Sequence, residues 1–269
     1  MTDVLVVEAG WATSVQDAGR GGHADLGVPA SGAVDGGLRD LLNRLVGNDR
    51  GAAVLETLGG LRIAVSTPAI VATSAERAAR AVAAGEVVDV QPAAGELWAY
   101  VAVRGGIEVP AVLGSRSRDS RSGIGPRVPM VGDRLPVGAD PGTALVVDQA
   151  PPRRRPDAVG VWPGPRVDWF VADALERLAA TLWTVSADVS RVGVRLDGPP
   201  LARRVDAELP SEGLLLGAVQ VPADGRPVVM LADHPTTGGY PVLAIVDRSD
   251  LSTVVQARPG SALRFHVLH

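Results

Sequence analysis

The sequence predicts a mainly β protein, and three observations support that prediction. Short valine-rich runs recur along the chain, and clusters of glycine, proline and aspartate separate them, as in strands joined by turns. The run at 98–103 is apolar on both of its alternating faces, which indicates a central strand covered on both sides. Leucines at helical spacing are confined to a few short segments. We therefore expect two β-rich halves with a few short helices.

The first half is expected to contain one helix among its strands. Leucines recur at helical spacing after Asp35, and Asp35 fits the cap that begins such a helix. Gly47 fits the stop at its C-terminal end. The strands of this half are predicted at residues 4–7, 61–65, 69–73, 87–90, 98–103 and 144–147.

The second half is expected to contain two helices. The first is predicted within 167–182, with Asp168 as its cap and Phe170 facing inward. The second is short, begins at Asp250 and is closed by the Pro-Gly pair that starts at Pro259. The strands of this half are predicted at residues 192–196, 218–221, 228–232, 242–246 and 263–267.

A stretch at 148–160 is rich in proline and charge, which makes it the most plausible linker in the chain. It places one domain at 1–150 and another at 157–269, with the linker at 151–156. The alternative is one continuous domain, because 269 residues suit either arrangement.

Composition excludes several kinds of chemistry. The chain has no cysteine, which excludes disulfides, thiolate nucleophiles and thiolate metal sites. It also has no lysine, since all 26 basic residues are arginine. A Walker-type phosphate loop, a Schiff base and a covalently attached biotin all require lysine, so none of them is expected on this chain.

The histidine spacing, the net charge and the hydropathy limit the possible partners and the cellular location of the protein. The four histidines show no metal-binding spacing, so no metal site is expected. The net charge of −4 argues against nucleic acid or an anionic membrane as the main partner. The N-terminus lacks the pattern of a signal peptide, and the longest apolar stretch is too short for a bilayer. A soluble cytoplasmic protein is therefore expected.

Glycine-rich loops at strand ends carry most of the polar residues that suit a site. Turns rich in glycine expose backbone N–H groups, and arginine offers a planar fork for carboxylate or phosphate, so these loops suit a small anion. The alternative is structural: pairs such as Arg118 and Asp119 tie the loops down, and glycine permits tight turns. The loops are residues 16–35, 102–110, 114–125 and 232–241.

The last of these loops, ADHPTTGGYP, carries more functional groups than a turn requires. Asp233 falls at the end of an apolar run, where a β scaffold can hold a side chain rigidly. Thr236 and Thr237 offer hydroxyls, and the two glycines that follow allow close approach of the backbone. A plain hairpin needs only two turn residues. We therefore expect this loop to belong to a site.

Four motifs follow one another over nearly the whole chain: SVQDAGRGG…LGVPASGAVD, AVRGGIEVPAVLGSRS, EGLLLGAVQVPADGRPVVMLAD and TTGGYPVLAIV. Together they resemble the biotin-dependent carboxyltransferase-like family. That family includes the C subunit of bacterial 5-oxoprolinase, also called allophanate hydrolase subunit 2, and a related region of urea carboxylase. The resemblance implies a β-rich fold with a cyclophilin-like barrel.

The resemblance also implies a function. It points to a subunit of an ATP-dependent 5-oxoprolinase complex, a hydrolase that opens 5-oxo-L-proline to L-glutamate. It implies two partner proteins similar to the B and A subunits of 5-oxoprolinase, and ATP at the level of the complex. Two alternatives stay open: carboxyltransferase or allophanate-type activity on urea derivatives, and a regulatory protein that binds a partner subunit.

The motifs supply the candidate residues. We expect Arg104 and Arg116 to bind the substrate carboxylate or a phosphorylated intermediate, and Asp35 or Asp233 to orient water or act as base. Gln16 and the loop at residues 236–239 are expected to hydrogen-bond the lactam, and all these residues to meet at one mouth of the barrel. The complete set of substrate-binding candidates is Gln16, Arg20, Arg104, Arg116, Gln220, Thr236, Thr237, Gly238, Gly239 and Tyr240.

Overall fold

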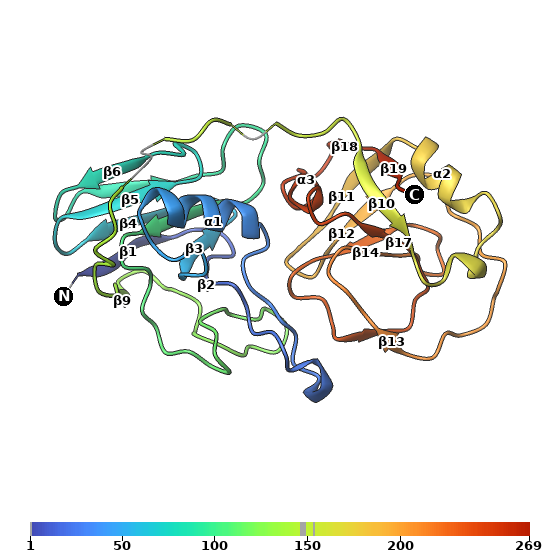
Figure 1. Cartoon of the computed structure of the whole chain (residues 1–269), viewed down its shortest axis with the longest axis horizontal. Helices are drawn as coiled ribbons and strands as arrows, with labels where there is room; N and C mark the ends of the chain where they lie inside the picture. The colour runs from blue at the N-terminus through green and yellow to red at the C-terminus, as the bar shows by residue number, and fades with distance from the viewer. Residues whose placement is uncertain (1, 146–148, 153) are drawn as a thin grey trace. The chain divides into compact units, whose positions relative to one another are not determined.

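The computed structural model describes residues 2–145, 149–152 and 154–269 and confirms a mainly β chain (Figure 1). The chain divides into two compact units. The first comprises residues 1–20 and 31–153, and the second comprises residues 21–30 and 154–269. The sequence predicts domains at 1–150 and 157–269, and these boundaries stay a prediction.

The first unit is a sandwich of two antiparallel sheets, and its core lies between them. Val4 and Ile63 enter that core from the sheet β7-β4-β1-β9, and Leu55 and Val101 enter it from the sheet β2-β3-β8-β5-β6. The strands are β1 (Asp3–Ala9), β2 (Ser14–Gln16), β3 (Val54–Thr57), β4 (Leu61–Val65), β5 (Ala69–Thr73), β6 (Ala79–Val82), β7 (Val87–Val90), β8 (Ala99–Val103) and β9 (Arg134–Pro136).

Strand β8 lies in the middle of the five-stranded sheet, between β3 and β5. All of its residues are buried. One face meets the core of the sandwich, and helix α1 (Gly36–Leu45) packs against β8 and β5 (Figure 1). The prediction of a central strand is therefore confirmed, with its start at Ala99.

Helix α1 begins and ends where the sequence predicts. Asp35 Oδ1 accepts a hydrogen bond from the backbone N–H of Leu38 at 3.0 Å, which satisfies a donor that the first turn leaves unpaired. Gly47 follows the last turn with a φ of +75°, in the left-handed region that favours glycine. Three leucines of the helix are buried.

The second unit is built on one eight-stranded sheet that almost closes into a barrel. Strands β18 and β19 lie at its two ends, yet Arg264 alone separates them in the chain. The sheet must therefore curl until its ends are neighbours, which confirms the cyclophilin-like architecture. Its order is β18 (Ala262–Leu263), β11 (Trp183–Val189), β12 (Gly193–Asp197), β15 (Val228–Met230), β14 (Ala218–Gln220), β17 (Val242–Val246), β10 (Val159–Pro163) and β19 (Phe265–Val267).

Helix α2 (Ala174–Ala180) is shorter than predicted, and the expected cap at Asp168 is wrong. Residues Val167–Trp169 form a separate 3₁₀ turn, and Phe170 is extended. Phe170 forms a β-bridge with Arg203, and this pairing interrupts the helical pattern. The side chain of Phe170 is nevertheless buried, as the spacing predicted.

Helix α3 (Leu251–Val255) follows Asp250 as expected, but the Asp250 carboxylate accepts a hydrogen bond from a backbone N–H of β10 at 2.8 Å. Nearby, Asp247 accepts hydrogen bonds from the hydroxyl and the N–H of Ser249 and from Trp162 Nε1. These bonds favour the carboxylate, with the Ser249 hydroxyl contributing most, and they lower the pKa of Asp247 to about 2.

Several strands escaped prediction because polar residues occupy buried positions. All three residues of β2 are buried, although two of them are Ser14 and Gln16, and β3 contains the buried Glu56. The strand predicted at 144–147 is absent at 144 and 145, and its remaining residues lie outside the described part of the chain. Two short strands, β13 (Glu212–Gly213) and β16 (Thr237–Gly238), form a separate ladder, and a 3₁₀ turn covers Ala24–Leu26.

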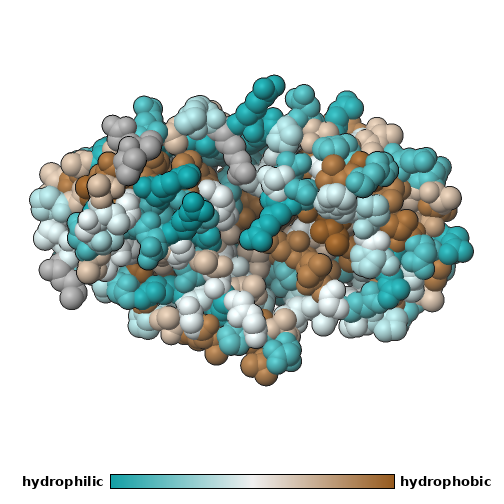
Figure 2. Space-filling view, viewed as in Figure 1, coloured by the Kyte–Doolittle hydropathy of each residue, from teal (hydrophilic) through white to brown (hydrophobic). Residues whose placement is uncertain are grey.

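The surface is polar with scattered apolar groups. Brown patches in Figure 2 show that hydrophobic residues reach the visible face. Across the described residues, Trp11, Leu26 and Val131 are the most exposed large apolar side chains. No helix in the described ranges has the length and apolar character to cross a bilayer.

Candidate functional site

Asp17 joins the first glycine-rich loop to the third within the first unit. Its buried carboxylate accepts hydrogen bonds from Ser115 Oγ at 2.6 Å, Ser117 Oγ at 2.5 Å and the backbone N–H of Arg116 at 2.5 Å. It also accepts from the N–H of Gly19 at 2.8 Å. The chain near residue 116 is therefore pinned to the end of β2, about a hundred positions away in sequence.

Two predicted binding residues lie in the same region. Gln16 is fully buried, and its Nε2 donates to Ser14 Oγ at 2.9 Å and to the carbonyl oxygen of Arg118 at 2.8 Å. Arg20 is also buried, and its guanidinium donates to the carbonyl oxygen of Ser117. The structure thus brings Gln16 and Arg20 together with the third loop.

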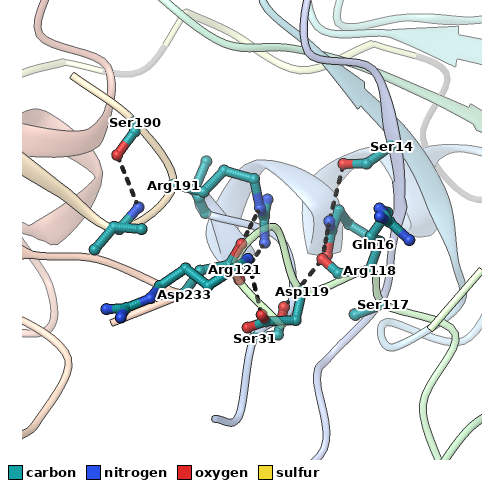
Figure 3. A network of polar contacts seen from close by, with 12 residues as sticks. Ser14, Gln16, Ser31, Ser117, Arg118, Asp119, Arg121, Ser190, Arg191 and Asp233 are labelled. Carbon is teal, nitrogen blue, oxygen red and sulfur yellow. Dashed lines mark hydrogen bonds and ion pairs between the residues drawn. The ribbon is translucent and has the colours of Figure 1, made fainter. Parts of the chain in front are cut away.

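A second carboxylate, Asp119, lies beside this junction and is fully buried. Its Oδ1 accepts hydrogen bonds from the N–H of Arg121 at 3.0 Å and from the N–H and hydroxyl of Ser122 at 2.6 and 2.8 Å. Ser31 Oγ donates to the carbonyl oxygen of Arg118 at 3.2 Å. Figure 3 shows Gln16, Ser31 and Asp119 gathered around the main chain of Arg118. We call these four residues the Arg118 cluster.

Asp119 was not among the predicted site residues. From the sequence, Asp119 is expected only as one half of an arginine–aspartate pair that ties down a loop. Part of that structural alternative holds, because Arg118 donates to the carbonyl oxygen of Pro126 at 3.0 Å and so braces the same loop. The available signal was an aspartate enclosed by serines and glycine in SRDSRSG.

The second loop is held by Arg104. Its guanidinium makes an ion pair with Asp140 at 2.7 Å and donates to the carbonyl oxygens of Val46 at 3.0 Å and Thr143 at 2.7 Å. The hydrogen bond with Asp140 raises the pKa of Arg104 and lowers the pKa of Asp140. Arg104 therefore fastens the segment at 140–143 to the end of α1.

Arg116 lines a cavity of about 380 Å³ in the first unit. The lining also includes Asn48, Gly105 and Glu108. Arg116 Nε donates to the carbonyl oxygen of Val109 at 2.9 Å, and its terminal nitrogen pairs with the Glu108 carboxylate. Of the two predicted anion-binding arginines, Arg116 is the one that faces this cavity.

Asp35 belongs to a buried network at the start of α1. Besides capping the helix, it donates its backbone N–H to Tyr100 Oη at 2.9 Å, and the Tyr100 hydroxyl donates to Glu56 Oε2 at 2.7 Å. Burial, followed by the charges of Glu56 and Asp35, raises the pKa of Tyr100 well above its usual value. The geometry gives Asp35 a structural task, and its predicted role as base stays a prediction.

Asp233 lies in the second unit and forms a buried ion pair. Arg191 Nε donates to one oxygen at 2.8 Å, and the terminal nitrogen donates to the other at 3.0 Å (Figure 3). The side chains are 5% and 0% exposed. Such a bidentate pair fixes the orientation of both groups. Sequence reasoning missed Arg191, which follows a strand-end serine in no recognisable motif.

The remaining candidates lie near one another at the β13–β16 ladder. Gln220 Nε2 donates to the carbonyl oxygen of Tyr240 at 3.0 Å, and the carbonyl oxygen of Thr236 accepts from Leu214. A Cβ on Gly238 would lie 2.6 Å from Gln220 Nε2, so the ladder has room for glycine only while Gln220 stays in place. Thr237 pairs in the ladder, and Gly239 leads to the half-exposed Tyr240.

The candidates thus form one group in each unit. Gln16, Arg20 and Arg116 converge with the third loop in the first unit, while Arg104 braces a neighbouring segment. Asp233 and the ladder residues belong to the second unit. A common mouth for both groups stays a prediction. Within the described residues, no group of three or more His, Asp or Glu side chains is arranged to hold a metal ion.

Comparison with known proteins identifies relatives over the whole chain. The family described as carboxyltransferase domain, subdomain A and B, matches residues 26–267. The C subunit of 5-oxoprolinase from Escherichia coli (strain K12) is 35% identical, over 97% of this chain and 89% of that protein. Urea amidolyase of Lachancea kluyveri is 34% identical, over 97% of this chain but 16% of that protein.

Solved structures agree with the fold. The crystal structure of TTHA0988 matches with a TM-score of 0.88 at 34% identity, over 99% of this chain and 55% of that chain. The chain thus spans about half the length of that solved protein. These matches confirm the resemblance drawn from the motifs.

Proposed function

The chain belongs to the carboxyltransferase domain family, subdomain A and B, and on that premise we propose that it is a subunit of an ATP-dependent 5-oxoprolinase complex hydrolysing 5-oxo-L-proline to L-glutamate. One observation carries this choice: the match to the C subunit of 5-oxoprolinase extends over nearly all of both proteins. The match to urea amidolyase has similar identity but covers a small part of a much larger enzyme.

The relative is named as one subunit of an enzyme, and that name supports partners for this chain. We propose two, similar to the B and A subunits of 5-oxoprolinase, with ATP used by the complex and the whole assembly in the cytoplasm. This chain has no lysine, so it cannot itself carry biotin through an amide to lysine. A small anionic substrate suits the arginines at the glycine-rich loops.

The geometry supports a division of roles among the candidates. Arg116, at the cavity, would bind the substrate carboxylate through its planar fork. Gln16 would hydrogen-bond the lactam. In the second unit, the Asp233 carboxylate would orient the guanidinium of Arg191 through their bidentate ion pair.

The test is reconstitution. We expect the chain, purified with its two partner proteins, to release glutamate from 5-oxo-L-proline only when ATP is present. The R116A variant should raise KM strongly, while R134A, which removes an arginine that is 63% exposed, should behave as wild type. Absence of glutamate release from an assembled complex would refute the proposed reaction.

A second candidate function is carboxyl transfer to urea derivatives. The 34% identity to a urea amidolyase over 97% of this chain favours it. The same complex should then carboxylate urea when it is supplied with a separate carrier protein whose biotin is already carboxylated, and it should ignore 5-oxo-L-proline. If neither substrate turns over and the chain still binds a partner protein, the regulatory alternative is supported.

A further inference from the structure

The Arg118 cluster contains two buried oxygen atoms that accept no hydrogen bond within the described residues. They are Gln16 Oε1 and Asp119 Oδ2. Leaving a buried acceptor unpaired costs more than an ordinary hydrogen bond gains, and a buried carboxylate oxygen costs more still. Native proteins keep few such atoms, and those they keep call for an explanation.

The orientation of the Gln16 amide is fixed by its surroundings. The carbonyl oxygen of Arg118 can only accept, so the amide nitrogen of Gln16 must face it. Ser14 Oγ lies 2.9 Å from the same nitrogen. Turning the amide over would place two acceptors against each other at Arg118. Gln16 therefore presents its oxygen away from both partners.

The orientation of the Asp119 carboxylate is fixed as well. Three donors hold Oδ1, from Arg121 and Ser122 of the same loop. With one oxygen held in this way, the other cannot turn to the same donors. The direction of Asp119 Oδ2 is thus fixed by the loop that carries it.

The two acceptors are anchored at the same peptide unit. Gln16 holds the carbonyl oxygen of Arg118, and that carbonyl is joined directly to the nitrogen of Asp119. Figure 3 shows both side chains at this peptide, with Ser31 on the same carbonyl oxygen. An amide oxygen and a carboxylate oxygen attract N–H donors and repel anions.

We propose that Gln16 Oε1 and Asp119 Oδ2 form an acceptor pair that binds the ring N–H of a small cyclic amide. This inference rests on the proposed function and extends it, because it assigns the nitrogen of the lactam to the Arg118 cluster. The carboxylate of the same substrate needs the opposite chemistry and would be bound elsewhere. Asp119 becomes a binding residue, although the sequence motifs alone did not select it.

The test compares two ligands that differ at one ring atom. One is 5-oxo-L-proline, and the other is its lactone counterpart, 5-oxotetrahydrofuran-2-carboxylate, in which oxygen replaces the N–H. Binding of each to the assembled complex is measured by titration calorimetry without ATP. A site built to accept from an N–H discriminates strongly against a ligand that lacks it. We expect the lactam to bind at least about tenfold more tightly than the lactone.

The variant D119N probes the acceptor directly. Its amide can keep Oδ1 toward Ser122 and then places an NH₂ group where Oδ2 was, so a donor would face the ligand nitrogen. The preference for the lactam should fall to about onefold or reverse. D25N is the matched control, because it makes the same chemical change at an exposed aspartate outside the Arg118 cluster. It should keep the wild-type preference.

The outcomes separate this inference from the proposed function. Equal binding of lactam and lactone by the wild type overturns the acceptor pair, and this measurement stands even if D119N fails to fold. An unchanged preference in folded D119N overturns it too. Asp119-dependent preference for the lactam in a complex without glutamate release would support the acceptor pair and refute the proposed reaction.

Discussion

Replacing Asp17 with alanine removes a buried carboxylate that accepts four hydrogen bonds. Each hydrogen bond to a charged group contributes about 1.5–3 kcal/mol, so the four together set an upper limit well above the effect of an ordinary mutation. The freed donors regain part of this by meeting water if the loop near Ser115 opens. We therefore expect D17A to lower the free energy of unfolding by about 3–5 kcal/mol.

Urea unfolding followed by tryptophan fluorescence measures this loss. The control is D25A, which removes an exposed aspartate of the first glycine-rich loop and should change stability by less than about 0.5 kcal/mol. Hydrogen exchange should also show faster exchange at the N–H of Arg116 in D17A. A loss of unfolding free energy below about 1 kcal/mol, with slow exchange retained at Arg116, would contradict the conclusion that the Asp17 carboxylate holds the two loops together.

Three further predictions concern packing and charge. G105A should destabilise the first unit by more than about 2 kcal/mol in a urea titration, because φ is +102° there and an added Cβ would meet a backbone oxygen; wild-type stability would contradict this. R191A should cost about 3–5 kcal/mol, since it leaves the Asp233 carboxylate buried without its bidentate partner, and the double variant R191M/D233L should recover much of the loss. Because hydrogen bonding, chiefly from Ser249, lowers the pKa of Asp247 below its unfolded value, its stabilising effect is complete above pH about 4 and is lost as the pH falls toward 2; D247N should unfold with a weaker pH dependence in that window, and an identical dependence would contradict the assignment.

Much of the fold could be predicted because its strands follow simple rules. The strands β4, β5, β7 and β17 coincide with valine-rich runs bounded by turn residues. The start of α1 followed from Asp35 and its end from Gly47. Strands β2 and β3 escaped because buried serine, glutamine and glutamate replace apolar residues in them. Those polar residues can be buried because they make hydrogen bonds that only the tertiary structure reveals.

The candidate site was predictable in part for the same reason. The motif glycines and arginines marked loops that the structure joins by hydrogen bonds, since Gln16 and Arg20 lie with the third loop. No local pattern pairs Asp17 with Ser115, or Arg191 with Asp233, because each pairing depends on how distant segments pack. Asp119 shows this limit, because the sequence does not reveal that one oxygen of its buried carboxylate accepts no hydrogen bond within the described residues.

The single residue between β18 and β19 has a consequence for synthesis on the ribosome. Strand β10 is the first of its sheet to emerge, yet it pairs in parallel with β19, which emerges last. Until Phe265–Val267 has left the exit tunnel, β10 and β11 each present an uncovered edge that another nascent chain could join. Closure of the sheet is therefore a late event dominated by contacts distant in sequence, and we expect chaperone dependence to rise sharply in chains truncated before residue 262.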